Sequence, residues 1–121
     1  MSSEIAEFPL PADATAEERA TAKREIGKYT KIIGEEPRVI RFDGKLIGQT
    51  GPVWHFQYTR LYQLPKGYLA AGHDLHEGIK VANAATAEDL PKAFENDLVR
   101  EFVEEELRYR KVIGSEHARA Q

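Results

Sequence analysis

Cysteine is absent from the 121-residue chain, and its absence removes three kinds of chemistry at once. No disulfide can form, no thiolate can act as a nucleophile, and no thiolate can bind a metal. Serine is scarce as well, because Ser2, Ser3 and Ser115 all lie close to the ends of the chain. The sequence also contains no glycine-rich phosphate loop and no nucleophile elbow. These gaps argue against the commonest enzyme classes and favour a non-enzymatic protein, while acid–base chemistry by carboxylates stays open.

Long apolar runs and a strong net charge are missing too. No stretch approaches the roughly 20 apolar residues of a membrane helix, and MSSEIAEFPLPAD at the N-terminus has no basic or apolar region typical of a signal peptide. The formal net charge is only −3, whereas nucleic-acid binding usually relies on a basic excess. We therefore predict a soluble, cytoplasmic protein with no membrane partner and no cofactor.

The chain is long enough for one domain, and 41% hydrophobic residues suit one modest core. Residues 1–14 contain Pro9 and Pro11 and are predicted to be a flexible N-terminal arm. Residues 15–114 are predicted to form the domain, and residues 115–121 a polar tail.

The first predicted helix begins at Thr15. Glu18 follows three residues later and completes a capping box. Gly34 is the expected end of this helix. Its apolar residues recur at helical spacing and are Ala22, Ile26, Tyr29 and Ile33.

The second predicted helix begins at Pro91, after a capped turn that starts at Thr86, and ends at Gly114. Two pairs four residues apart, Glu104 with Arg108 and Glu106 with Arg110, have the order that supports a helix. Its predicted apolar stripe consists of Phe94, Leu98, Phe102, Val103 and Leu107.

Between the helices the sequence is typical of strands. Residues 53–64 (VWHFQYTRLYQL) alternate strictly, and PKG at 65–67 indicates a hairpin to residues 68–75. Residues 78–84 predict one more strand. In residues 38–51, Asp43-Gly44 indicates either a tight turn or a bulge within one long strand. The predicted fold is α+β: an N-terminal helix, a meander of three to four antiparallel strands, and a C-terminal helix packed on one sheet face.

The stretch GHDLHEG, residues 72–78, offers a candidate metal site. His73 and His76 would share one side of a helix and could both bind zinc. The glycines at 72 and 78 instead favour a polar turn between two strands, with Asp74 bonded to local backbone.

The aromatic face of residues 53–64 is the second candidate site. Trp54, Tyr58, Arg60 and Tyr62 could line a ligand pocket, with His55 or His73 for proton transfer. The same face could stack single-stranded nucleic acid. An aromatic row at period two is more typical of a core beneath a helix, and Arg60 would then lie at a sheet edge, pair with a carboxylate or mark a pocket mouth.

Part of the chain resembles the EXLDI family of small actinobacterial proteins. The matching features are an F-x-G-x-L-like strand in RFDGKLIGQ, a tyrosine-bearing hairpin in YTRLYQLPKGYLAAG, and a leucine-bearing helix start in VANAATAEDLPKAF. The similarity spans residues 38–107, but the chain ends in GSEHARAQ without the motif that names the family. It implies a bacterial protein and assigns no catalytic residue. The residues that carry the resemblance are Phe42, Gly44, Leu46, Tyr62, Gly67 and Leu90.

The leading functional hypothesis is a small non-enzymatic regulatory or accessory protein, acting through protein–protein contacts with a partner or as a homodimer. An open sheet face and the acidic C-terminal helix, which contains VEEEL at 103–107, would supply the contacts. The alternatives are a small-molecule-binding or enzymatic domain with a pocket between sheet and helices, and a module that binds single-stranded nucleic acid on the sheet.

Overall fold

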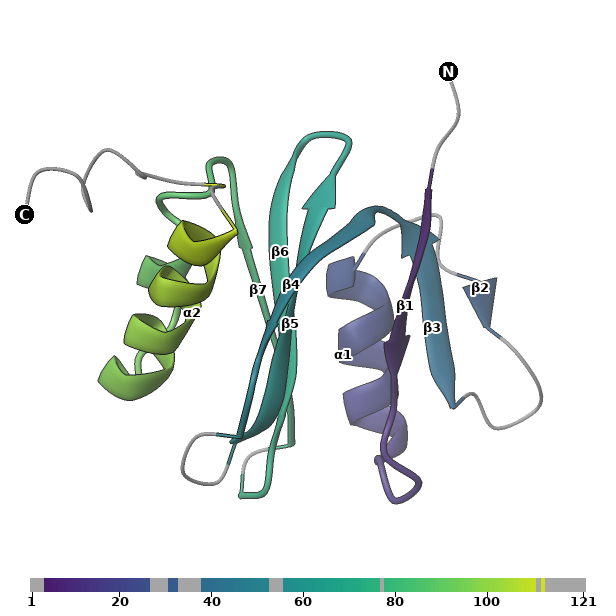
Figure 1. The fold of residues 1–121 in the computed structure, drawn as a ribbon. Coiled ribbons are helices and arrows are strands. Elements are labelled where there is room, and N and C mark those ends of the chain that lie inside the picture. The colour runs from purple at the N-terminus through teal and green to yellow at the C-terminus, as the bar shows by residue number, and fades with distance from the viewer. Residues whose placement is uncertain are drawn as a thin grey trace, which may run out of the picture.

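A four-stranded antiparallel sheet forms the middle layer of the molecule (Figure 1). The computed structural model describes residues 4–26, 31–32, 38–52, 56–76, 78–110 and 112. The order in the sheet is β4-β5-β6-β7. Its strands are β4 (Lys45–Thr50), β5 (Phe56–Leu64), β6 (Gly67–Asp74) and β7 (Gly78–Ala84).

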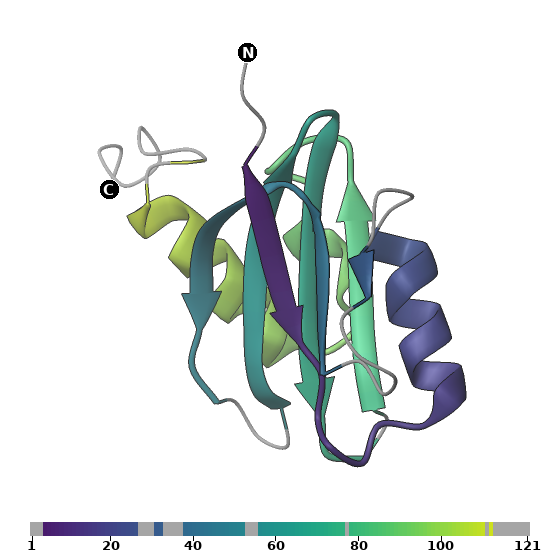
Figure 2. The same ribbon diagram turned by 90° about the vertical axis from the view of Figure 1, so that its right-hand side faces the viewer.

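Both faces of this sheet are covered, which differs from the predicted open face. Helix α2 lies on one side, and helix α1 lies on the other together with a second, three-stranded sheet of order β1-β3-β2 (Figures 1 and 2). The α+β class with antiparallel strands is confirmed. The bounds of these elements are α1 (Ala16–Ile26), α2 (Asp97–Tyr109), β1 (Ile5–Pro9), β2 (Lys31–Ile32) and β3 (Val39–Asp43).

A strand, rather than a helix, is the first element of the chain. The prediction of a flexible arm over residues 1–14 is wrong for β1, which pairs antiparallel with β3 so that Phe8 lies opposite Ile40. Ala6 and Phe8 are buried, as is Leu10 just beyond the strand. These apolar residues alternate at period two, the spacing that buries one face of a strand once a partner strand is present.

Helix α1 begins as predicted but is shorter. The Thr15 backbone N–H donates to Glu18 Oε1 (2.9 Å) and the Glu18 N–H donates to Thr15 Oγ1 (3.0 Å), which confirms the capping box. The helix ends at Ile26 instead of Gly34, and Lys31–Ile32 pairs with β3 as β2. Ala22 and Ile26 are buried as expected, whereas Tyr29 and Ile33 lie outside the described residues.

Asp43-Gly44 is neither a hairpin turn nor a bulge. Here the chain leaves β3 of the small sheet and enters β4 of the large one. A Cβ atom at Gly44 would lie 3.1 Å from Phe42 Cε2 and 3.3 Å from the Gln63 carbonyl oxygen, so the crossing of the two sheets leaves little room for a side chain. The irregularity in pairing comes later, between Leu46 and Gly48.

Two hairpins complete the large sheet. Leu64 pairs with Gly67 across Pro65-Lys66, and Asp74 pairs with Gly78 across residues 75–77. Gly67 has φ of 107° and Gly78 has φ of 86°, backbone conformations that glycine adopts at low cost.

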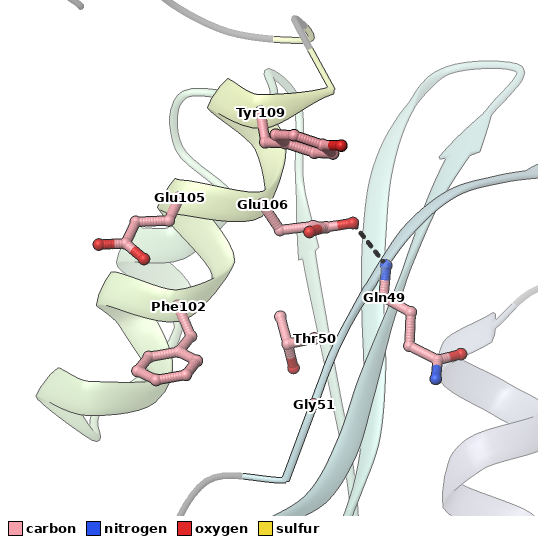
Figure 3. A pocket seen from close by; sticks show the side chains of 7 residues that line it. All are labelled: Gln49, Thr50, Gly51, Phe102, Glu105, Glu106 and Tyr109. Atoms are coloured by element: carbon pink, nitrogen blue, oxygen red, sulfur yellow. Dashed lines mark hydrogen bonds between the residues drawn. The ribbon is translucent and has the colours of Figure 1, made fainter.

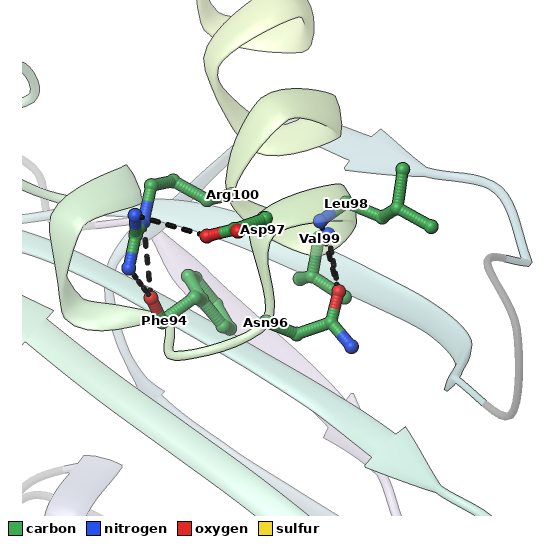
Figure 4. Close-up of polar contacts among 6 residues, drawn as sticks. All are labelled: Phe94, Asn96, Asp97, Leu98, Val99 and Arg100. Atoms are coloured by element: carbon green, nitrogen blue, oxygen red, sulfur yellow. Dashed lines mark hydrogen bonds and ion pairs between the residues drawn. The ribbon is translucent and has the colours of Figure 1, made fainter.

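Helix α2 starts later than the sequence predicted. Pro91 opens only a short 3₁₀ turn, η1 (Pro91–Ala93), and the helix follows Asn96, whose side-chain oxygen accepts from the Leu98 N–H (2.9 Å) and the Val99 N–H (3.1 Å) (Figure 4). Arg100 donates twice to the Phe94 carbonyl, at 2.6 and 3.1 Å, and so ties the helix to the preceding turn. Both predicted ion pairs form: Glu104–Arg108 at 3.3 Å and Glu106–Arg110 at 2.9 Å.

Two clusters of buried side chains hold the layers together. The one between the two sheets and α1 contains Ala6, Phe8, Leu10, Ala14, Ala22, Ile26, Ile40, Phe42, Tyr62, Leu69, Ala71 and Ile79. The one beneath α2 contains Leu61, Ala70, Ala87, Leu90, Phe94, Val99, Val103 and Leu107. Within the described part of the chain, neither helix is long and apolar enough to cross a membrane.

Candidate functional site

The predicted aromatic face of β5 lies against β1 of the small sheet, not beneath a helix. Tyr62 is fully buried, packs edge-on against Phe42 with ring centres 4.8 Å apart, and donates its hydroxyl proton to the Glu7 carbonyl at 2.7 Å. Burial raises the pKa of both Tyr58 and Tyr62 above their usual value, although the charge of Arg60 opposes the shift. Both hydroxyls therefore stay protonated. Trp54 and His55 lie outside the described residues.

Arg60 is held within this layer by contacts to its own chain. Its Nη1 atom lies 3.5 Å from the Glu7 carbonyl, and its guanidinium carbon is 5.3 Å from the centre of the Tyr58 ring. The Glu7 carboxylate pairs with Arg41 (2.7 Å). The Arg60 guanidinium therefore contacts the Glu7 backbone carbonyl and the Tyr58 ring rather than the Glu7 carboxylate. The Nε atom of Arg60 is buried and has no hydrogen-bond partner among the residues that the structure describes.

His73 joins this cluster from β6. Its ring centre lies 4.9 Å from that of Tyr58 and 5.2 Å from that of Phe8. Burial lowers the pKa of His73 below the usual 6.5, and the positive charge of Arg60 lowers it further. A hydrogen bond with the Pro9 backbone and the negative charges of Glu18 and Asp13 act in the opposite direction, but burial is the largest effect. The imidazole is therefore neutral at pH 7, with a buried Nε2 atom that lacks a partner in the described part of the chain.

The two histidines of the stretch GHDLHEG lie in different surroundings. His73 ends up between two aromatic rings, whereas His76 is exposed in the turn after β6. The Asp74 carboxylate accepts the His76 backbone N–H at 2.7 Å, which is the local bonding predicted for a polar turn. Across the described ranges, no three His, Asp or Glu side chains gather as metal ligands would.

An open pocket of about 240 Å³ lies elsewhere, between the end of β4 and helix α2 (Figure 3). It contains neither Arg60 nor a histidine, in contrast to the pocket that the ligand-binding hypothesis required. From α2, the Glu106 carboxylate and the Tyr109 ring are directed towards β4, while the Glu105 carboxylate points away from the strand at the outer rim (Figure 3). Its lining residues are Gln49, Thr50, Gly51, Phe102, Glu105, Glu106 and Tyr109.

Glu106 joins the helix to the edge of the sheet in this pocket. Its mostly buried carboxylate accepts the Gln49 backbone N–H at 3.1 Å and pairs with Arg110 at 2.9 Å. Gly48 makes room for it, because a Cβ atom there would come within 2.9 Å of Glu106 Oε2. Figure 3 shows the Tyr109 ring also directed towards β4, while Glu105 lies at the outer rim.

Helix α2 exposes apolar side chains beside this pocket. Leu98, Phe102 and Tyr109 have 37%, 41% and 77% of their surface exposed. Assigning Leu98 and Phe102 to the core was wrong, because Val99, Val103 and Leu107 form the buried stripe. The sequence signal for the buried stripe was the regular four-residue spacing of Val99, Val103 and Leu107.

In comparisons with known proteins, no family model, no curated protein and no solved structure matches this chain. The resemblance to the EXLDI family stays a prediction, as does a ligand-binding role for Tyr58, Arg60 and Tyr62.

Proposed function

We propose that this protein is a non-enzymatic regulatory or accessory protein that acts in the cytoplasm through protein–protein contacts. The contact surface is the outer side of α2 with the adjoining end of β4. The observation that carries the proposal is the row of exposed apolar side chains, Leu98, Phe102 and Tyr109, beside the open pocket of about 240 Å³. An exposed apolar patch with polar residues at its rim is typical of an interaction surface.

Three of the side chains that the sequence singled out for chemistry are engaged inside the fold. Tyr62 and Arg60 both contact the Glu7 carbonyl, and His73 packs between Phe8 and Tyr58. Both alternative functions placed their ligand on the β5 face, and that face lies against β1. This arrangement supports a structural role for these side chains.

Site-specific photo-crosslinking tests the proposed surface. A benzoylphenylalanine replacing Phe102 should form a discrete crosslink with a protein in cells that naturally make this chain. The same group at Ala20, on the exposed side of α1, is the matched control and should give none. Unlabelled wild-type protein should suppress the crosslink, and unlabelled protein carrying both Phe102→Asp and Tyr109→Asp should not. A crosslink pattern that is the same from both positions would contradict the proposal.

A further inference from the structure

The exposed side of α2 has the residue spacing of a helix that packs against a second helix. Leu98, Phe102, Glu105 and Tyr109 follow one another at intervals of four, three and four residues, as the seam positions of a coiled coil do. This outer stripe lies beside the buried stripe of Val99, Val103 and Leu107. Helix α2 therefore has one stripe for its own sheet and a second one that its own fold leaves exposed.

The neighbouring sheet edge does not favour an added strand. Strand β4 is the edge strand of the large sheet, and strand addition uses the backbone groups that point outward from such an edge. At Gln49 the outward N–H already donates to Glu106, and the pairing of β4 is irregular between Leu46 and Gly48. A helix lying along α2 fits this surface better than an extended segment does.

Charge on the stripe favours a basic partner. Residues 97–110 contain five acidic and three basic side chains, a net charge of −2 (3 minus 5). Asp97, Glu104 and Glu106 pair with the three arginines. Within the described chain, the acidic side chains of α2 without an ion pair are Glu101 and Glu105. A second copy of α2 would bring like charges together, which is unfavourable, whereas a lysine or arginine opposite Glu105 would be attracted.

The pocket provides space for such a side chain. The Phe102 and Tyr109 rings line it, and aromatic faces attract ammonium and guanidinium groups. Arg110 of the chain itself already contacts both a carboxylate and an aromatic ring here. It pairs with Glu106, and its guanidinium carbon lies 5.7 Å from the centre of the Tyr109 ring. We infer that the outer stripe of α2 binds a basic amphipathic helix of another protein, whose lysine or arginine enters the pocket beside Glu105. This inference rests on the proposed function.

Two synthetic helical peptides test the inference on the full-length protein. Both carry leucines at the seam positions; one has lysine at the central seam position and the other has glutamate there. In fluorescence anisotropy titrations, wild-type protein should bind the lysine peptide about tenfold more tightly, a difference equivalent to about 1.4 kcal/mol. Glu105→Lys should reverse this preference. Glu17→Lys, an equal change of charge on the exposed side of α1, should leave it as in the wild type.

Amide chemical shifts locate the bound peptide. Perturbations should centre on residues 98, 102, 105 and 109. A preference that Glu105→Lys does not change, or perturbations centred away from α2, would overturn the inference. So would a protein dimer in native mass spectrometry that Phe102→Asp dissociates, since a second copy would then occupy the stripe. If Phe102 still crosslinks to another protein in any of these cases, the proposed function stands and only the basic helix is rejected.

Discussion

At the scale of single residues, His73 has its protonation set by a strand far away in the sequence. Phe8 on β1 and Tyr58 on β5 enclose the imidazole, and this burial is the main cause of its lowered pKa. The unfolded chain, with the usual value of 6.5, therefore binds more protons than the folded chain at mildly acidic pH. Stabilisation by neutral His73 is complete above the unfolded-state pKa and is lost as the pH falls through the folded-state pKa.

Replacing His73 should thus weaken the dependence of stability on pH. We expect the free energy of unfolding to fall less for His73→Gln than for wild type between about pH 7.5 and about pH 5.5. Urea unfolding followed by circular dichroism at both pH values measures the two differences. Equal losses for His73→Gln and wild type would contradict this account.

At the scale of elements, helix α2 is started by Asn96, the residue just before it, and not by Pro91, which the sequence suggested as its first residue. Asn96 satisfies two of the backbone N–H groups that a helix start leaves unpaired, those of Leu98 and Val99 (Figure 4). Because α2 supplies both the buried stripe and the proposed contact surface, its N-cap also supports the candidate site.

Removal of this cap should destabilise the protein without changing the fold. We expect Asn96→Ala to lower the free energy of unfolding by about 1 kcal/mol, the usual cost of losing an N-cap side chain. Asn96→Asp retains an acceptor oxygen at the same place and should lose much less. Chemical denaturation of the three proteins gives the comparison, and equal effects of the two substitutions would show that the acceptor oxygen is not what matters.

At the scale of the whole molecule, β1 joins the two sheets. It pairs with β3 through its backbone, while Phe8 and the Glu7 carbonyl contact residues of the large sheet. Its side chains help to bury Tyr62 and His73, which is why the β5 face is interior. Strand β1 and Leu10 after it are thus part of the core rather than an appendage.

Truncating Phe8 should therefore cost much of the stability of the protein. We expect Phe8→Ala to lower the free energy of unfolding by about 3–5 kcal/mol, as for other fully buried phenylalanines. Ile5→Ala, on the same strand but 65% exposed, should change it by no more than about 0.5 kcal/mol. In NMR titrations the pKa of His73 should also rise towards its usual value in Phe8→Ala. A loss as small as that of Ile5→Ala would show that β1 contributes little to the core.

The sequence by itself determined the features that depend on neighbours a few residues apart. The capping box at Thr15, the hairpin at Pro65-Lys66 and the ion pairs of α2 all formed as predicted. Each joins residues three or four apart, so spacing along the chain is enough to reveal it.

Tertiary structure alone decided the remaining features, because they rest on contacts between distant segments. Tyr62 bonds the Glu7 carbonyl 55 residues away, and this contact turns a candidate binding face into an interior one. Residues 5–9 and 31–32 became strands because β3 offers both of its edges to them. The orientation of α2 about its own axis was likewise decided by packing. The stripe of Val99, Val103 and Leu107 meets the sheet, which leaves Phe102 and Tyr109 exposed.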